Sequence, residues 1–322
     1  MALAVADLVA RAREGDPRSV GRLISLVEGA SPQLREAMAA LAPYAGGATT
    51  VGLTGSPGVG KSTTTSMLIA AFRAQGRRVG VLAIDPSSPF SGGALLGDRI
   101  RMQEHATDPG VYIRSMGTRG HLGGLSWATP QAARVLDAAG CDVVIIETVG
   151  VGQAEVDIAA LADTTVVLLA PGMGDGIQAA KAGILEIADV FAVNKADRDG
   201  ADLTVRDLRN MLALAGPRPP DAWIPPILTT VASANQGTDE LVAALDAHRA
   251  WLVESGTLTR RRLARASAEI ETIAVTALRE QIADLRDGTM LADLSAAVLA
   301  GETDPYAAAD RLIAAIGAED LG

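Results

Sequence analysis

Gly55-Ser56-Pro57-Gly58-Val59-Gly60-Lys61-Ser62 is the stretch that decides the fold of this chain. It has the phosphate-binding loop pattern, in which two glycines separated by four residues are followed by a lysine and a hydroxyl residue. Residues 50–54 before it, Thr-Val-Gly-Leu-Thr, predict a short buried strand. Residues 63–75 after it carry apolar side chains at helical spacing, with Gly76 as the predicted helix end. The glycines thus fall between a strand and a helix, which favours a nucleotide site over an ordinary glycine turn.

The residue types of this loop suit a nucleoside triphosphate. Glycines leave the backbone amides open to phosphate oxygens, and the start of the following helix adds its own unpaired N–H groups. We expect Lys61 to reach the outer phosphates and the hydroxyl of Ser62 to bind Mg²⁺. The predicted nucleotide contacts of this loop are Gly55, Ser56, Pro57, Gly58, Val59, Gly60, Lys61, Ser62 and Thr63.

Composition and charge limit the class of protein. The 322 residues are 48% hydrophobic but include only three each of Phe, Trp and Tyr, so a large core must be built from aliphatic side chains. The net charge of −10 speaks against nucleic-acid binding, and we interpret the basic cluster 260–262 first as a solvated helix face and second as a partner contact. A single cysteine, Cys141, excludes an internal disulfide framework and cysteine-based zinc clusters; it enters an apolar strand and is expected to be a small buried residue.

The sequence contains neither a secretory signal nor a membrane span that we can identify. The first residues lack a positive region followed by a long apolar core, and no apolar run reaches the roughly 18 residues that a bilayer requires. We therefore expect a soluble, cytoplasmic protein that does not bind membranes.

The middle of the chain predicts the fold class. Residues 49–256 alternate continuous apolar strands with amphipathic helices, which is typical of an α/β domain whose parallel sheet is covered on both faces. Together with the loop at 55–62, this predicts a P-loop NTPase with a mostly parallel sheet. Beyond the first strand, the expected strands are 79–84, 111–114, 143–146, 165–170, 190–193 and 227–231, with helices at 130–139 and 179–187 among those between them.

Helical regions flank this domain. Residues 1–48 form an N-terminal helical extension, in which Asp16-Pro17 and Ser31-Pro32 predict helix starts. Residues 257–322 carry no strand signal and form a C-terminal helical region, with expected helices at 258–285, 291–299 and 305–316. The long apolar stripe of the first of these favours an arm that embraces a second subunit over a tail that packs back on the domain.

Polar residues stand at the carboxyl ends of the predicted strands. These residues are Ser56, Asp85, Glu147, Asn194 and Ser233. Ligands of open parallel sheets bind at that edge, so the separate motifs are expected to meet on one rim.

Asn194-Lys195-Ala196-Asp197 matches the guanine-recognition motif of GTP-binding proteins. A carboxylate at Asp197 can accept hydrogen bonds from both N–H groups on one edge of guanine, whereas adenine leaves it unpaired and so pays a desolvation cost. Asn194 would hold the loop, and the stem of Lys195 would cover the base. The four residues alone could form a surface turn, but their place after a strand, well downstream of a phosphate loop, favours guanine. Ser233-Ala234-Asn235 fits the companion loop whose amides reach the guanine carbonyl.

Carboxylates near the phosphate loop complete the predicted site. Glu147 ends a strand and can order the Mg²⁺ shell, and Gly150 leaves an N–H for a γ-phosphate. Gln153 could orient water. Asp85 and Asp98 are further candidate Mg²⁺ ligands, although Asp98 could instead cap a helix.

Several longer motifs together resemble the MeaB/ArgK family of GTPase chaperones of methylmalonyl-CoA mutase, which includes the methylmalonic aciduria type A protein. They are, besides the phosphate loop, Asp85-Pro-Ser-Ser-Pro, Gly92-Gly-x-x-Leu-Gly-Asp98-Arg-x-Arg-Met102, Leu122-Gly-Gly124, Glu147-Thr-Val-Gly-Val-Gly-Gln153 and Pro171-Gly-x-Gly-Asp175-x-x-Gln178-x-x-Lys181. The match runs over about residues 50–240, and the segments beginning at Glu147 and Pro171 are far more specific than the phosphate loop.

The resemblance implies a homodimer through the C-terminal arm and a low intrinsic GTPase activity that the mutase activates. It further implies a role in gating adenosylcobalamin loading and in protecting or rescuing an acyl-CoA mutase, with methylmalonyl-CoA mutase as the first candidate. Asp175 and Lys181 match the family's additional switch. Ser56 stands where proteins of the same structural class often carry a second lysine, so no intersubunit lysine is expected from this loop. The loop 119–121 also departs from the family pattern, which leaves it without an assigned role.

The sequence therefore predicts a GTP-hydrolysing metallocofactor chaperone that uses GTP, GDP and Mg²⁺, with Lys61, Glu147 and Gln153 as its catalytic residues. A nickel-insertion GTPase is an alternative, although one cysteine and three scattered histidines offer few ligands for nickel. An ATP-dependent kinase or transport ATPase is another, opposed by the guanine motif. A third is a scaffold in which the nucleotide is only structural.

Overall fold

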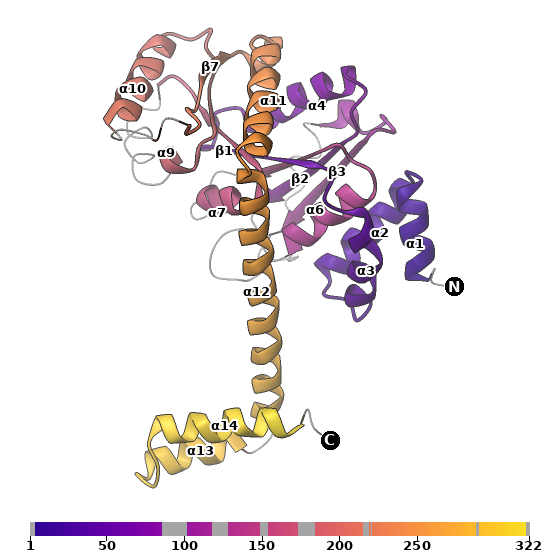
Figure 1. Cartoon of the computed structure of the whole chain (residues 1–322), viewed down its shortest axis with the longest axis vertical. Coiled ribbons are helices and arrows are strands. Elements are labelled where there is room, and N and C mark those ends of the chain that lie inside the picture. Colours follow the sequence, from indigo (N-terminus) through magenta and orange to yellow (C-terminus); the bar gives the residue numbers. More distant parts are fainter. Residues whose placement is uncertain are drawn as a thin grey trace. The chain divides into compact units, whose positions relative to one another are not determined.

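The computed structural model of the chain describes residues 4–85, 102–117, 128–148, 154–172, 184–214, 219, 221–287 and 290–319. The chain divides into two compact units, Met1–Arg261 and Arg262–Gly322. The first unit carries the sheet and the second unit is helical (Figure 1).

A seven-stranded parallel sheet organises the first unit, in the order β3-β2-β4-β1-β5-β6-β7. The strands are β1 (Thr49–Thr54), β2 (Val79–Asp85), β3 (Val111–Gly117), β4 (Val143–Thr148), β5 (Thr164–Leu169), β6 (Val190–Asn194) and β7 (Ile227–Thr230). The chain moves outward from β1 to β2 and β3, returns to insert β4 beside β1, and then builds the other half. This confirms the predicted fold class, and the crevice at the carboxyl ends of the central strands is the expected ligand site.

Both faces of the sheet are covered because successive residues of each strand are apolar. In β4, Ile145 packs on one face and Val144 on the other, and both are fully buried. The helices α4 (Lys61–Ala74) and α11 (Thr238–Glu254) contribute to the core on the first face. The helices α6 (Ala128–Ala138), α7 (Ala154–Leu161) and α10 (Ala201–Leu214) cover the second face.

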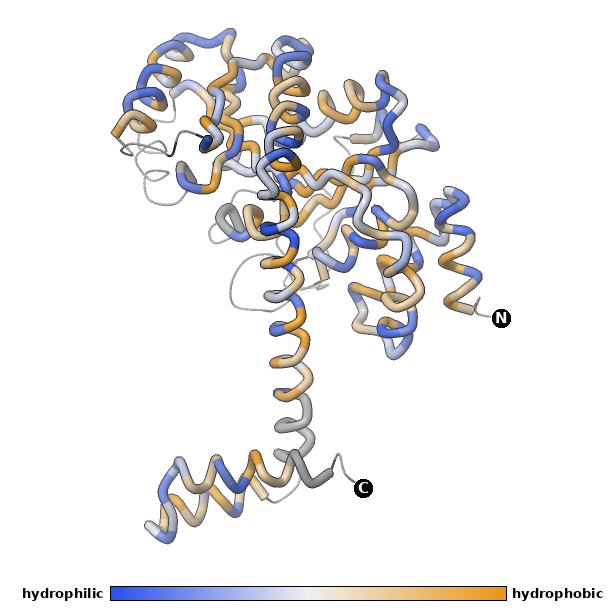
Figure 2. The backbone as a smooth tube through the Cα atoms, in the orientation of Figure 1, coloured by the Kyte–Doolittle hydropathy of each residue, from blue (hydrophilic) through white to orange (hydrophobic). Residues whose placement is uncertain are grey.

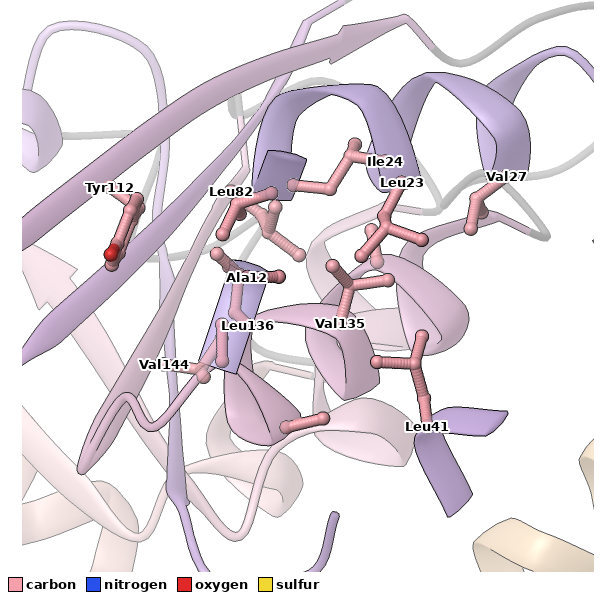
Figure 3. Close-up of a cluster of buried hydrophobic side chains, with 14 of the residues drawn as sticks. Ala12, Leu23, Ile24, Val27, Leu41, Leu82, Tyr112, Val135, Leu136 and Val144 are labelled. Carbon is pink, nitrogen blue, oxygen red and sulfur yellow. The ribbon is translucent and has the colours of Figure 1, made fainter. Parts of the chain in front are cut away.

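The N-terminal helices share a core with the sheet. They are α1 (Val5–Arg13), α2 (Pro17–Glu28) and α3 (Leu34–Leu41), followed by the short helix η1 (Ala42–Tyr44). Figure 3 shows Leu23 and Ile24 of α2 in one cluster of buried side chains with Leu82 of β2, Val135 of α6 and Val144 of β4. Burial of these side chains therefore ties residues predicted as an extension to the second face of the sheet.

Of the two helix starts predicted in the N-terminal region, one is confirmed and the other is wrong. Asp16 caps α2 as expected, since its carboxylate accepts hydrogen bonds from the backbone N–H groups of Arg18 and Ser19 at 3.3 and 3.1 Å. The start predicted at Ser31-Pro32 was wrong by two residues, because Ser31 and Pro32 form a turn and α3 begins at Leu34.

The phosphate-loop helix also begins two residues earlier than predicted, at Lys61 rather than Thr63. Gly60 precedes it with a φ of 98°, a left-handed conformation that glycine adopts without strain. Of the helix expected at 179–187, only α9 (Ile184–Ile187) lies within the described residues. Cys141 is buried as predicted, and burial raises the pKa of its thiol to about 12.

An ion pair joins the start of α12 (Thr257–Asp287) to the end of the sheet at which β6 begins. Arg261 Nη2 lies 2.9 Å from Asp189 Oδ1, and Nη1 lies 3.1 Å from Oδ2. The Asp189 carboxylate also accepts a hydrogen bond of 2.9 Å from the backbone N–H of Thr165, at the start of β5. The expectation that all of residues 260–262 form a solvated face was thus wrong for Arg261, which is half-buried because Asp189 lies beneath it.

The ring of His248 is fully buried beside this ion pair. Its Nδ1 lies 2.8 Å from the hydroxyl of Thr164, and its Nε2 lies 3.3 Å from Asp189 Oδ1 without a hydrogen bond. The rings of Trp223 and Trp251 pack against it, with centroids 4.8 and 5.7 Å away. Burial lowers the pKa of His248 to about 4, so the ring is neutral at neutral pH.

The second unit consists of the remainder of α12 together with α13 (Met290–Leu299) and α14 (Pro305–Glu319), which pack against each other. Along α12, apolar residues are interspersed with polar ones (Figure 2). Several of these apolar side chains are exposed, namely Leu263, Ile270, Ile273, Val275 and Leu278. No helix in the described part of the chain is long and apolar enough to cross a membrane.

Candidate nucleotide site

The phosphate loop leaves the carboxyl end of β1 and enters α4. Gly55 and Gly60 have φ values of 141° and 98°, and a side chain at either position would collide with a neighbour: the carbonyl of Leu168 at Gly55, and the amide of Asn194 at Gly60. The loop can pass this close to β5 and β6 only with glycine at both positions. The helix that follows points its first, unpaired N–H groups toward the loop, which is the arrangement that binds phosphate.

The side chain of Lys61 folds over the loop. Its Nζ donates hydrogen bonds to the carbonyl oxygens of Gly55 and Ser56, at 2.6 and 3.0 Å, and the residue is 7% exposed. A buried ammonium group needs such acceptors, and phosphate oxygens placed in the loop could replace them.

Glu147 reaches the start of α4 from the neighbouring strand. In the register of the sheet, Glu147 of β4 lies beside Leu53 of β1, so its side chain stands next to the loop that follows β1. Its Oε1 accepts a hydrogen bond of 2.6 Å from the hydroxyl of Ser62, and its Oε2 accepts one of 2.7 Å from the hydroxyl of Thr65. The carboxylate is almost completely buried and faces the two hydroxyls.

Asn194, at the end of β6, joins three segments by its side-chain amide. The Nδ2 atom donates a hydrogen bond of 2.8 Å to the carbonyl of Val59 in the phosphate loop. The Oδ1 atom accepts hydrogen bonds from the hydroxyl of Thr230 and the backbone N–H of Ala232, at 3.2 and 3.0 Å. Lys195 adds a second link, since its Nζ donates to the carbonyl of Gly58 at 2.6 Å. The predicted guanine motif and the phosphate loop therefore form one hydrogen-bonded unit.

Most of the remaining residues of the two predicted base-recognition loops are exposed. Asp197 is exposed, and so are Ser233 and Ala234 of the short helix η4 (Ala232–Ala234) and Asn235, which follows it. Lys195 has a φ of 58°, and the next N–H, that of Ala196, donates to the carbonyl of Thr230 at 3.0 Å. The left-handed turn at Lys195 and this bond hold the segment 195–197 against the end of β7. Asp197 is thereby presented to solvent on the rim where Asn194 anchors the motif.

Other predicted site residues lie outside the described residues. These are Asp98, Gln153, Asp175 and Lys181, as well as Gly150 and the loop 119–121. The backbone of Asp85 ends β2, paired with Gly117 of β3, but its side chain is also outside the described part. Within the described residues, no group of three or more His, Cys, Asp or Glu side chains could hold a metal ion by themselves.

Sequence reasoning missed Thr65 and Thr230. The signal for Thr65 was a hydroxyl three residues after Ser62, on the same face of a helix. That spacing could not identify Glu147 as its partner, because the contact depends on β4 lying next to β1. Thr230 gave no signal of its own beyond its place at the end of a strand.

Comparisons with known proteins agree with this geometry. Residues 20–286 match the family described as Methylmalonyl Co-A mutase-associated GTPase MeaB. A Pyrococcus abyssi protein assigned as a GTPase is 48% identical over 309 residues, which cover 95% of each chain. A Caenorhabditis elegans protein described as a mitochondrial methylmalonic aciduria type A homolog is 40% identical over 216 residues, 66% of this chain and 54% of that protein. The solved structure of a protein titled LAO/AO transport system kinase superposes with a TM-score of 0.69 at 27% identity, covering 98% of this chain and all of that one.

Proposed function

Because the chain belongs to the MeaB family of methylmalonyl-CoA mutase-associated GTPases and is a hydrolase acting on GTP, we propose that it is a chaperone of methylmalonyl-CoA mutase. In this role it gates the loading of adenosylcobalamin into the mutase and protects or reactivates that enzyme. The observation that carries the proposal is the family match over residues 20–286. The likeness to the methylmalonic aciduria type A homolog supports it further.

The described site supports a hydrolysis that depends on positioning and electrostatics. Water attacks the γ-phosphate in line with the leaving oxygen, and the main requirement is that negative charge on the phosphates be matched by fixed donors. Lys61 would exchange the carbonyls of Gly55 and Ser56 for phosphate oxygens, and the loop amides and the start of α4 would hold the rest of the chain of phosphates. Among the described residues around the loop, no strong general base stands out, which agrees with the slow intrinsic turnover that we expect.

The residues around Ser62 fit a Mg²⁺ ion. This ion prefers oxygen ligands, and the Ser62 hydroxyl and the Glu147 carboxylate provide them at one end of the phosphate loop. A buried carboxylate also favours a nearby cation, since its desolvation must be offset. When bound, Mg²⁺ neutralises charge on the outer phosphates. Ser62 would hold it directly, and Glu147 would orient its shell.

The nucleotide base would be selected by the segment that Asn194 ties to the phosphate loop. Asp197 would accept both N–H groups of guanine, and the backbone around Ser233, Ala234 and Asn235 would reach its carbonyl. The remaining roles stay predictions of the sequence: water orientation by Gln153, metal support by Asp85 and Asp98, and switching by Asp175 and Lys181.

A homodimer is part of the proposal, with the second copy of the chain covering the apolar stripe of α12. Leu263 and Ile270 are seven residues apart, Ile273 follows three residues later, and these side chains are 63, 68 and 47% exposed. Replacing Ile270 by Glu should convert a dimer to a monomer in multi-angle light scattering. Glu271→Lys, an equally drastic change at an exposed position of the same helix, should leave the dimer intact.

The mutase proposal is tested by co-purification. The protein would be mixed with methylmalonyl-CoA mutase, and separately with related adenosylcobalamin-dependent acyl-CoA mutases, in GDP and in a non-hydrolysable GTP analogue. We expect a nucleotide-dependent complex and faster GTP hydrolysis with one of them. Absence of both with every mutase would refute the chaperone role. A Lys61→Ala variant that still reactivates the mutase would instead favour a scaffold whose nucleotide is only structural.

A further inference from the structure

Two hydroxyls from one turn of α4 hold the two oxygens of a single carboxylate. Ser62 donates to Glu147 Oε1 at 2.6 Å and Thr65 donates to Glu147 Oε2 at 2.7 Å. All three residues are buried, with exposed fractions of 6, 0 and 3% for Ser62, Thr65 and Glu147. Because each carboxylate oxygen has its own donor, both the direction and the plane of the carboxylate are fixed.

The hydroxyl of Thr65 faces two acceptors, and the Glu147 carboxylate is the stronger of them. Thr65 Oγ1 also lies 3.1 Å from the carbonyl of Lys61, but a hydroxyl carries one proton and can donate it only once. A carboxylate at 2.7 Å is a better acceptor than a carbonyl at 3.1 Å, since hydrogen bonds to charged groups are shorter and stronger. The Thr65 proton therefore goes to Glu147.

We propose that Thr65 is a positioning residue for the magnesium site. It lies one turn beyond Ser62 and acts through Glu147, which it holds in the orientation that the Mg²⁺ shell requires. This inference rests on the proposed Mg²⁺ site. Ser62 must serve both the metal and Glu147, whereas Thr65 can remain with Glu147 throughout the cycle. Loss of the Thr65 hydroxyl should therefore lower the affinity for the metal ion and leave the contacts with the guanine base unchanged.

Thr64 supplies a matched control within the same helix turn. It is also fully buried, and its hydroxyl donates to the carbonyl of Gly60 at 3.0 Å. Thr64→Val and Thr65→Val each remove one buried hydroxyl that lies near a carbonyl four residues earlier, and they retain similar volume. Of the two hydroxyls, that of Thr65 donates to the carboxylate and that of Thr64 donates to a backbone carbonyl, so a difference between the two variants reports on Glu147.

The test measures metal binding without turnover. Mn²⁺ would serve as a spectroscopic substitute for Mg²⁺ and would be titrated into the GDP complex. The concentration of free Mn²⁺ would be measured by electron paramagnetic resonance. Thr65→Val and Thr65→Ala should weaken Mn²⁺ binding by about tenfold or more, the range for lost outer-shell partners. Thr65→Ser, which restores the hydroxyl, and Thr64→Val should bind Mn²⁺ as the wild type does. GDP affinity in EDTA should be the same in all of them.

The outcomes separate this inference from the proposed function. Equal Mn²⁺ affinity in Thr65→Ala and Thr65→Ser would overturn the positioning role while leaving the magnesium site in place. A wild-type GDP complex that binds no Mn²⁺ would overturn the magnesium site and the inference with it. If Thr65→Val does not fold, the pair Thr65→Ala and Thr65→Ser, which differ by the hydroxyl alone, carries the comparison. A loss of GDP affinity in EDTA that accounts for the whole effect would also refute it, because it would indicate general damage to the loop.

Discussion

The guanidinium of Arg261 donates two hydrogen bonds, 2.9 and 3.1 Å long, to the carboxylate of Asp189 at the end of the sheet opposite the phosphate loop. Asp189 stands immediately before β6, and Asn194 ends the same strand. The five-residue strand β6 thus connects the ion pair near the start of α12 to Asn194, which anchors the predicted guanine motif.

We expect Arg261→Ala to destabilise the first unit by about 1.5–3 kcal/mol, because it leaves a nearly buried carboxylate without its charged donor. The free energy of unfolding can be measured from urea titrations followed by tryptophan fluorescence. Trp223 and Trp251 report on this region because both rings pack against His248, which lies next to the ion pair. Arg260→Ala is the control. That side chain is exposed and donates a hydrogen bond to the hydroxyl of Thr257 on the same helix, so its loss should change stability by less than about 0.5 kcal/mol. Equal effects of the two variants would contradict the prediction.

The free energy of unfolding should decrease as the pH is lowered from about 6.5 to about 4, because of His248. Burial lowers the pKa of the folded-state ring from 6.5 to about 4, with Asp189 opposing and Arg261 reinforcing the shift. The unfolded chain therefore takes up a proton first as the pH falls, so the stability that the neutral ring provides is complete above pH 6.5 and is lost progressively down to pH 4. The shift corresponds to about 3 kcal/mol at most. In His248→Gln this part of the pH dependence should disappear, and an unchanged slope would rule out His248 as its source.

Asp197→Asn should reverse the choice of base. The amide cannot accept from both N–H groups of guanine but can pair with xanthine, so GTP affinity should fall by roughly 100-fold or more and XTP affinity should rise. Competition of GTP, XTP and ATP against a fluorescent GDP analogue measures this. Asp199→Asn removes another exposed carboxylate two residues away and should leave the preference for GTP unchanged. If Asp197→Asn keeps that preference, the guanine assignment is wrong.

Cys141 should be inert in the native protein. Its thiol is buried and its pKa is raised from 9.0 to about 12, which reduces the thiolate fraction about a thousandfold at neutral pH. Reaction with a chromogenic disulfide should therefore be very slow until the chain is unfolded in urea, when one thiol per chain should react rapidly. Rapid reaction of the folded protein would place Cys141 at the surface.

Much of the fold was predictable because its signals are local. Strands such as Val143–Thr148 are continuous apolar runs, the loop at 55–62 carries its own spacing, and Asp16-Pro17 has the chemistry of a helix start. Predictions failed where local signals compete, and where a residue distant in the sequence sets the surroundings of a side chain. Ser31-Pro32 formed a turn before the helix, and Arg261 left the solvated face because a carboxylate 72 positions away lies beneath it.

By itself, therefore, the sequence determined the class of this protein: a phosphate loop, a parallel sheet, and a guanine motif on the same rim. Only the tertiary structure decided which of those residues touch. Thr65 and Glu147 are 82 positions apart, and Val59 and Asn194 are 135 apart. Their contacts follow from the order β2-β4-β1-β5-β6 of the central strands, which places β4 against the loop after β1 and brings β6 within reach of it from the other side. Hydrophobic periodicity specifies that strands are buried, but the order in which they lie is set by how the whole core packs.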